Sequence, residues 1–354
     1  MIRRAASLSW GFSSCGGAFA LYAWRAPLLR QGGLFAPISR EGALVFNNLF
    51  LITACSTVFV GTLYPLALEE LTGEKISVGP PFFNSTFGPL FIPLMIVMPF
   101  GPLLGWKRGD LFGAAQRLLA AAVVVAVTIA AAFALEHGGP VLAPFGVGVA
   151  VFVMTGAVID IVERTMILRV PFGAALWRAL GLPRSAWGTA FAHFGIGLTL
   201  LGIISATAWG SERIAEVKPG TNLYIAHYRL TFDGLFNCSG PNYRDVVGHF
   251  TVRRTSGELI GAIEPSRRTF PTRNMVTTEA ALMTRGVSQL YLSLGDPNQN
   301  GAVPVRLYFK PRVLMIWLGA VFMFIGGSLS LSDRRLRVGA PKPARARVAV
   351  QPAE

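Results

Sequence analysis

Long apolar runs alternate along the chain with short polar loops that are rich in arginine. A helix that crosses a membrane needs about 20 consecutive apolar residues. Seven runs approach this length: Leu8 to Trp24, Ala43 to Leu66, Phe87 to Trp106, Leu118 to Leu135, Val141 to Ile161, Trp187 to Gly210 and Val313 to Leu331. The pattern predicts a membrane α-helical bundle of about seven transmembrane helices, six of them within residues 1–210 and the last within residues 311–332.

The long polar segment at residues 211–310 has the pattern of β-strands. Apolar side chains recur at every second position from Tyr224 to Phe232, which predicts one strand with His227 on its polar face. The same period of two returns around Phe250 and in Val305 to Phe309. We therefore expect a β-rich domain inserted before the last helix.

Basic residues in the short loops set the orientation that we expect. One inner loop contains Lys107, Arg108 and Arg117, another contains Arg164, Arg169, Arg178 and Arg184, and residues 333–354 form a basic cytoplasmic tail. Alternation then places residues 211–310 outside. The net charge of +14 would suggest nucleic acid in a soluble protein, but with 52 % hydrophobic and 14 % charged residues it fits the inner loops of a membrane protein, and we expect no nucleic-acid partner.

The start of the chain does not follow this charge rule. Alternation places Arg3 and Arg4 outside, where basic residues are disfavoured. This mismatch suggests that the chain does not begin where its ancestor began.

His193, near the start of the Trp187 to Gly210 run, is the candidate site residue. An ionisable side chain inside a span faces the bundle interior and is a functional hypothesis by default, although a packing role stays open. Nearby glycines (Gly188, Gly195, Gly197 and Gly202) leave a surface for another helix or a flat cofactor.

Four prolines interrupt the run from Phe87, which predicts a kinked or broken helix packed within the bundle. They are Pro89, Pro93, Pro99 and Pro102. The preceding segment from Ile76 to Asn84 has the proline and glycine density of an outer loop.

Other polar residues have structural interpretations as well as functional ones. We expect Asp160 and Glu163 to be acids at a helix end that face headgroups and Arg164, rather than a proton path. The cluster of Arg267, Arg268 and Arg273 fits an exposed loop, or a site for carboxylates of a ligand or partner. We expect His137, His227 and His249 on the surface, and neither the histidines nor Cys15, Cys55 and Cys238 have the spacing of a zinc site or a redox pair.

Several unusual strings resemble the CcmF/NrfE family of cytochrome c-type biogenesis proteins, in order from about Tyr22 to Arg335. They are YAWRAP from Tyr22, SREGALVFNN from Ser39, GTLYP from Gly61, ISVGPPFFN from Ile76, AHFG from Ala192, TEAAL from Thr278, LYLSLGD from Leu290, KPRVLMIWLGA from Lys310 and GGSLSLSDRR from Gly326. The resemblance covers only the C-terminal half of the family pattern.

The resemblance implies a part of the haem lyase of system I cytochrome c maturation, which joins haem to apocytochrome c on the periplasmic side of the bacterial inner membrane. It implies CcmH-like and CcmE-like partners and an intramembrane haem b held by two histidines. The second of these lies in the AHFG-like string and maps onto His193. The tryptophan-rich segment that binds the delivered haem, its two flanking histidines and the other haem b ligand would lie upstream of Met1, so an N-terminal half is also implied as a partner.

Two other classes of function remain open from the residues alone. A secondary transporter or channel would explain the broken span and the membrane acids, but it predicts internal repeats, which we do not find. A membrane anchor that presents residues 211–310 to partners predicts that substitutions within the membrane are silent.

Overall fold

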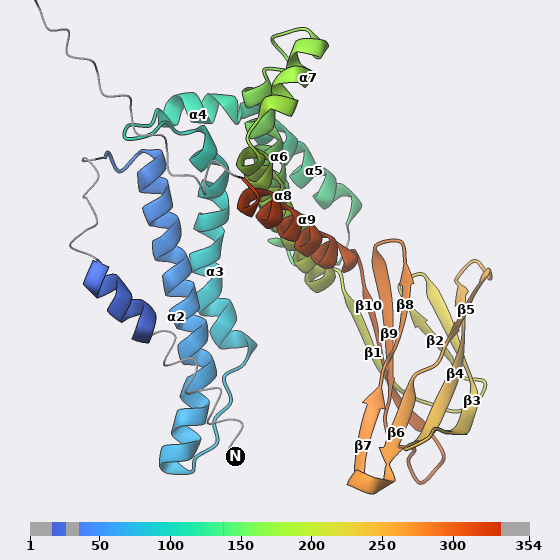
Figure 1. Cartoon of the computed structure of the whole chain (residues 1–354). Coiled ribbons are helices and arrows are strands. Elements are labelled where there is room, and N and C mark those ends of the chain that lie inside the picture. The colour runs from blue at the N-terminus through green and yellow to red at the C-terminus, as the bar shows by residue number, and fades with distance from the viewer. Residues whose placement is uncertain (1–15, 26–34, 137, 334–354) are drawn as a thin grey trace, which may run out of the picture.

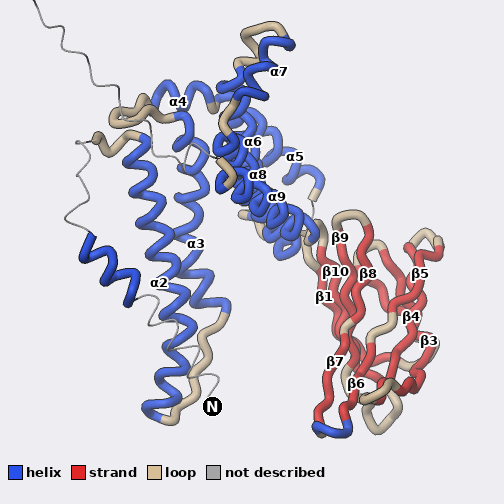
Figure 2. Tube along the Cα trace, viewed as in Figure 1, coloured by secondary structure: helices blue, strands red, loops and turns tan. Residues whose placement is uncertain are grey.

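The computed structural model describes residues 16–25, 35–136 and 138–333 and divides them into a helical part and a β-sandwich (Figure 1). Figure 2 shows that the long helices and the strands are segregated into these two parts. The helices are α2 (Arg40–Thr72), α3 (Pro80–Val97), α4 (Leu111–Arg117), α5 (Leu119–Leu135), α6 (Ala143–Thr165), α7 (Phe172–Gly181), α8 (Arg184–Ala208) and α9 (Leu314–Leu331). A further short helix occupies residues 16–25.

Five helices in the described residues are long and apolar enough to cross a membrane: α2, α3 with its extension, α6, α8 and α9. The bent pair α4 and α5, with an angle of 53° between the two helices, would make a sixth span. The seven predicted spans are thus confirmed only in part, and the run from Leu8 to Trp24 lies outside the described residues over its first half. The basic tail from Asp333 onward also lies outside them, except for Asp333 itself.

The broken proline-rich helix is confirmed, but its start was predicted wrongly. Helix α3 ends at Val97 and continues as the 3-10 helix η2 (Met98–Leu103), while Pro89 and Pro93 lie within α3. The predicted outer loop becomes helical at Pro80, with Gly79 as N-cap. Proline is well suited to the first turn of a helix, where its missing N–H would have no partner, so a proline pair there begins a helix instead of preventing one.

Glycines of α8 and α9 allow the two helices to pack at backbone contact distance. A Cβ atom at Gly188 would lie 2.6 Å from the carbonyl oxygen of Gly326, and one at Gly195 would lie 2.6 Å from that of Gly319. Gly197 approaches the carbonyl oxygen of Ala150 in α6 in the same way, at 2.7 Å. Of the two uses that the sequence left open for this glycine surface, the structure shows helix packing.

The sandwich consists of ten antiparallel strands in two sheets (Figure 1). The strands are β1 (Ser211–Val217), β2 (Asn222–Ile225), β3 (Tyr228–Ser239), β4 (Arg244–Arg254), β5 (Leu259–Ile263), β6 (Ser266–Phe270), β7 (Met275–Glu279), β8 (Ala281–Arg285), β9 (Ser288–Leu294) and β10 (Val303–Lys310). One sheet has the order β1-β10-β9-β8. The other has the order β2-β3-β4-β6-β7, with β5 paired to β4.

The strand that we predicted through His227 is two strands. β2 ends at Ile225 and β3 begins at Tyr228, so Ala226 and His227 form the turn of a hairpin. Ala226 adopts a φ of 49°, a left-handed conformation that alanine rarely takes and that the sequence therefore did not reveal. The turn also reverses one face assignment, because Ile225 is buried whereas Tyr224 is 51 % exposed.

The sandwich is attached to the bundle at the end where α8 finishes and α9 begins. Ser211 pairs with Phe309 in the ladder between β1 and β10, so the two ends of the domain lie side by side. Arg312 forms an ion pair with Glu136, the C-cap residue of α5. The arginine-rich connections, with α4 and α7, lie at the opposite end of the bundle (Figure 1).

Candidate functional site: a seam beside His193

His193 lines a cavity between two groups of helices. Helix α2 and the junction of α3 with η2 form one wall, and α8 forms the other. The cavity measures about 240 Å³, and its polar side chains are those of Arg40, Asn47, Thr189 and His193. The rest of the lining is apolar, so the imidazole lies in a seam of mixed polarity between the two groups of helices.

Two of the other polar side chains at the seam, those of Thr189 and Arg40, interact with groups other than His193. Thr189 donates a hydrogen bond to the carbonyl oxygen of Ser185 at 3.0 Å, as its place in α8 allows. The guanidinium of Arg40 lies over the ring of Trp106, 4.9 Å from the ring centroid. Within the described part of the chain the ring of His193 has no hydrogen-bond partner, which leaves a ring nitrogen available to a ligand.

The imidazole of His193 is a group that could hold a haem iron, but the cavity around it is small. A neutral imidazole is a common axial ligand of haem iron. The cavity of about 240 Å³ is smaller than the roughly 300–1,000 Å³ that ligand pockets usually measure. His193 is the only histidine in the described helices, because His227 and His249 lie in the sandwich and His137 falls outside the described residues. The chain would supply one ligand and one side of such a site.

Asp160 is more deeply buried than we predicted. Its pairing with Arg164 is confirmed, with 2.8 Å between Oδ1 and Nε. However, Asp160 is only 3 % exposed, and its Oδ2 has no hydrogen-bond partner. It therefore does not face headgroups, unlike Glu163, which lies nearer the helix end with Arg117 at 4.0 Å and Arg169 at 3.7 Å. Spacing in sequence could not separate these two acids, since burial depends on the helices that pack against α6.

Two arginines of the predicted cluster lie in a strand and form ion pairs within the domain. Arg267 and Arg268 belong to β6, and Arg273 ends the 3-10 turn η3 (Pro271–Arg273) that follows. Arg267 pairs with Asp296 at 2.7 Å, and Arg268 pairs with Asp245 at 2.9 Å. The prediction of an exposed loop was wrong for the first two, and their carboxylate partners come from this chain.

The sandwich histidines are at the surface, but each has a defined environment. His249 lies between two acids, with Nδ1 2.8 Å from Asp233 and Nε2 3.5 Å from Glu264. His227 is exposed at its hairpin turn, and its ring centroid lies 4.1 Å from that of Tyr228. No group of three or more potential metal ligands of the His, Cys, Asp or Glu type occurs among the described residues.

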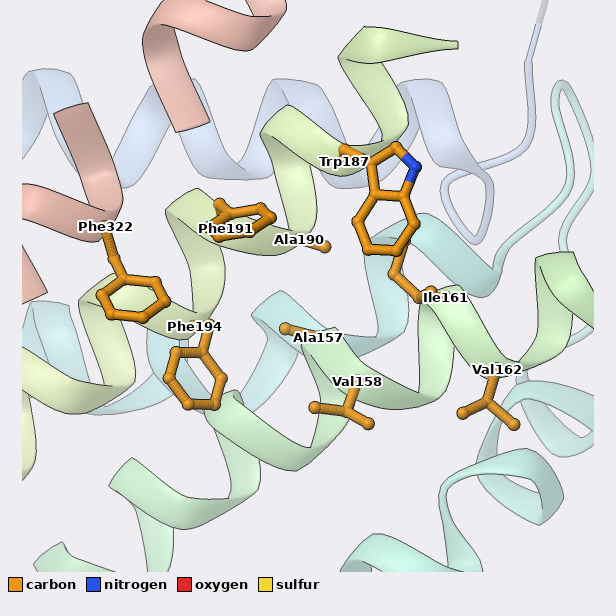
Figure 3. A pocket seen from close by; sticks show the side chains of 9 residues that line it. All are labelled: Ala157, Val158, Ile161, Val162, Trp187, Ala190, Phe191, Phe194 and Phe322. Atoms are coloured by element: carbon orange, nitrogen blue, oxygen red, sulfur yellow. The ribbon is translucent and has the colours of Figure 1, made fainter. Parts of the chain in front are cut away.

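A second, apolar cavity on the other side of α8 was not predicted from the sequence. It measures about 320 Å³ and lies between α6, α8 and α9, where aromatic rings form much of its wall (Figure 3). Its lining residues are Ala157, Val158, Ile161, Val162, Trp187, Ala190, Phe191, Phe194 and Phe322. The spacing of Trp187, Phe191 and Phe194 at intervals of four and three residues was the available signal, because it places all three rings on one helix face.

Comparison with known proteins relates this chain to proteins of cytochrome c biogenesis. The family profile described as the CcmF C-terminal beta-sandwich matches residues 208–311, which comprise the strand domain. The chain is 58 % identical to the cytochrome c-type biogenesis protein CycK of Bradyrhizobium diazoefficiens, over 96 % of this chain and 51 % of the relative. It is 34 % identical to CcmF of Escherichia coli, over 91 % of this chain and 48 % of that protein.

A solved structure named as the cytochrome c haem lyase CcmF has the same fold. It superposes with a TM-score of 0.65 and covers 84 % of this chain and 46 % of that one, at 24 % sequence identity. The chain thus spans about half the length of the curated relatives that it matches.

Proposed function

This chain is a member of the CcmF/NrfE family of cytochrome c-type biogenesis proteins, and we propose that it acts as one part of a haem lyase that attaches haem to apocytochrome c. The observation that carries the proposal is the position of His193, whose ring has no hydrogen-bond partner within the described chain and lines a seam between helices. In this role His193 would hold the iron of an intramembrane haem b. Bound there, the haem would supply electron transfer.

The residues around His193 would hold and shield this ligand. The glycine contacts of α8 with α6 and α9 fix the backbone that carries the ring, and the opposite wall from α2 and α3 is apolar apart from Arg40 and Asn47. The absence of an internal hydrogen bond leaves the ring free to turn toward an iron. The second ligand and the remaining wall come, in this proposal, from an N-terminal half of the same family, whether or not it is a separate chain.

The proposed setting is the bacterial inner membrane, with the sandwich in the periplasm. The arginine-rich connections lie at the end of the bundle opposite the sandwich, as an orientation with basic loops in the cytoplasm requires (Figure 1). The sandwich would then lie where apocytochrome c is available, together with CcmH-like and CcmE-like partners.

The test is to co-express this chain with an N-terminal half of the family and to measure the absorbance spectrum of the purified complex. We expect His193→Ala to abolish most of the haem b absorbance, while Thr189→Ala, one turn earlier on the same cavity wall, leaves it in place. Imidazole added to a His193→Gly complex should restore part of the spectrum. An unchanged spectrum in the correctly assembled His193→Ala complex would exclude the ligand role.

A further inference from the structure

The apolar cavity between α6, α8 and α9 lies at the arginine-rich end of the bundle. Its lining comes from the last two turns of α6 before Thr165 and the first three turns of α8, with Phe322 from α9. Val158 is 50 % exposed, so the cavity opens on the outer surface of the helices rather than into their interior (Figure 3). In a membrane this opening faces lipid.

Two arginines near Trp187, which lines this cavity, form no ion pair with a carboxylate among the described residues. Arg184 lies three residues before Trp187 and therefore on the same face of α8. Within the described residues its guanidinium contacts the carbonyl oxygen of Ser332 through Nη1, at 3.5 Å. Arg178, in α7, contacts the sulfur of Met166 at 2.7 Å, and a thioether is a weak acceptor for a guanidinium.

Helix α7 is held against the cavity by the indole of Trp187. The Nε1–H of Trp187 donates a hydrogen bond to the carbonyl oxygen of Ala179, the residue after Arg178, at 3.2 Å. Arg178 is thereby fixed beside a ring that lines the cavity. Trp177 is 78 % exposed next to it, and exposed tryptophans typically lie at the level of the lipid headgroups.

Neighbouring arginines at this end have carboxylate partners. Arg164 pairs with Asp160, and Arg169 pairs with Glu163. The Asp333 carboxylate accepts a hydrogen bond from the backbone N–H of Ser185 at 3.0 Å. Among the described residues near Trp187, Arg178 and Arg184 are thus the basic side chains without an ion pair to a carboxylate.

We infer that this cavity binds one anionic phospholipid, with an acyl chain against the aromatic wall and the phosphate between Arg178 and Arg184. Basic groups between transmembrane helices attract anionic headgroups in this way. The volume of the cavity fits an acyl chain better than a helix of a partner protein. A helix with its side chains is about 10 Å wide, so about 320 Å³ would hold less than one helical turn. The inference concerns a second site and does not depend on haem at His193.

The headgroup preference tests the charge part of this inference. The full chain, purified in detergent and stripped of lipid, is titrated with phosphatidylglycerol or phosphatidylcholine carrying the same acyl chains, and bound lipid is counted by native mass spectrometry. Each arginine near a membrane surface contributes about fivefold in affinity for anionic lipid, so Arg178→Gln with Arg184→Gln should lower the preference for phosphatidylglycerol by about 25-fold. Arg169→Gln, an exposed arginine at the same end that is paired with Glu163, is the matched control and should change nothing.

The acyl chain part has a separate readout. Lipids brominated along the acyl chain should quench Trp187, measured as the difference between the wild type and Trp187→Phe, and Val158→Phe should weaken both lipids alike by filling the opening. Equal affinity for the two headgroups, an equal loss in the Arg169→Gln control, or no quenching of Trp187 would overturn the inference. So would crosslinking from position 158 to a protein subunit in the assembled complex together with loss of quenching, because a partner helix would then occupy the cavity.

Discussion

The two parts of the molecule bury different kinds of side chain. The sandwich has one core of large residues, among them Phe232 and Phe250, whose ring centroids are 4.8 Å apart. In the helical part the buried apolar residues are mostly alanines, for example Ala150 at 0 % and Ala121 at 1 % exposure. The largest apolar side chains of the helices point outward instead, as Trp317 does at 70 % exposure.

This difference follows from the solvent of each part. In water, burying large apolar side chains is the main favourable term in folding. Between helices in a membrane that term is absent, because lipid is as apolar as leucine, and close packing of small residues replaces it. The predictions below disturb each part through the interaction on which it depends.

The largest expected effect comes from removing an aromatic ring of the sandwich core. Phe250 is fully buried at 0 % exposure, so Phe250→Ala should lower the free energy of unfolding of the sandwich by about 3–5 kcal/mol. Urea unfolding of an isolated domain covering residues 208–313, followed by far-UV circular dichroism, measures this. Tyr224→Ala, at a position that is 51 % exposed, is the control, and a similar loss there would contradict the account of the core.

In the bundle the sensitive positions should be glycines rather than large residues. A Cβ atom at Gly326 would lie 2.6 Å from the carbonyl oxygen of Gly188, whereas one at Gly327 would meet nothing within 4 Å. Gly326→Ala should therefore destabilise the bundle by about 1–3 kcal/mol, the usual cost of overpacking. Gly327→Ala, the adjacent control, should be neutral.

Thermal stability of the full chain in detergent, followed by size-exclusion chromatography of a fluorescent fusion, distinguishes the two glycine variants. Equal melting temperatures would show that α8 and α9 do not pack through their backbones at this point. A lower melting temperature for Gly327→Ala alone would show that the face of α9 with Gly327, rather than the face with Gly326, packs against α8.

The sequence predicted the class of each part because apolar period and run length are local properties. The long apolar runs and the alternation at Val305 to Phe309 can be recognised without knowing which residues pack against them. The alternation became β10, and five of the runs became helices long and apolar enough to cross a membrane. The predictions of element boundaries failed where packing neighbours or an unusual backbone conformation determine the local structure. The positive φ of Ala226 splits a strand that its side-chain pattern makes continuous, and Pro80 begins a helix where proline density suggested a loop.

The sequence predicted His193 as the candidate residue, but it did not predict which other residues line its cavity. His193 is conspicuous because a lone ionisable side chain in an apolar run is costly. Its cavity combines α2 and the α3–η2 junction with α8, which begins about eighty residues after η2 ends, so the lining could not be assembled from local pattern. The same holds for Asp160 and Glu163, three residues apart on α6, of which only the first is buried.

The smallest expected effect is a pH dependence confined to the sandwich. Partial burial, together with the positive charge of Arg254, lowers the pKa of His227 below its ordinary value of 6.5. As the pH falls through 6.5, the unfolded chain takes up a proton that the folded domain does not, so stability should decrease until the pH reaches the lower pKa of the folded state. His227→Gln should remove this slope from the urea midpoint measured between pH 7 and pH 5.

Asp233 provides an internal reference at lower pH. Burial opposes ionisation of this carboxyl, but hydrogen bonds from Thr251 and His249 outweigh it and lower the pKa of Asp233 below its ordinary value of 3.8. Its contribution is complete above that value and is lost only as the pH falls through the lower folded pKa, so the two groups act in separate pH windows. A slope between pH 7 and pH 5 that survives in His227→Gln would therefore have to arise from a group other than His227 or Asp233.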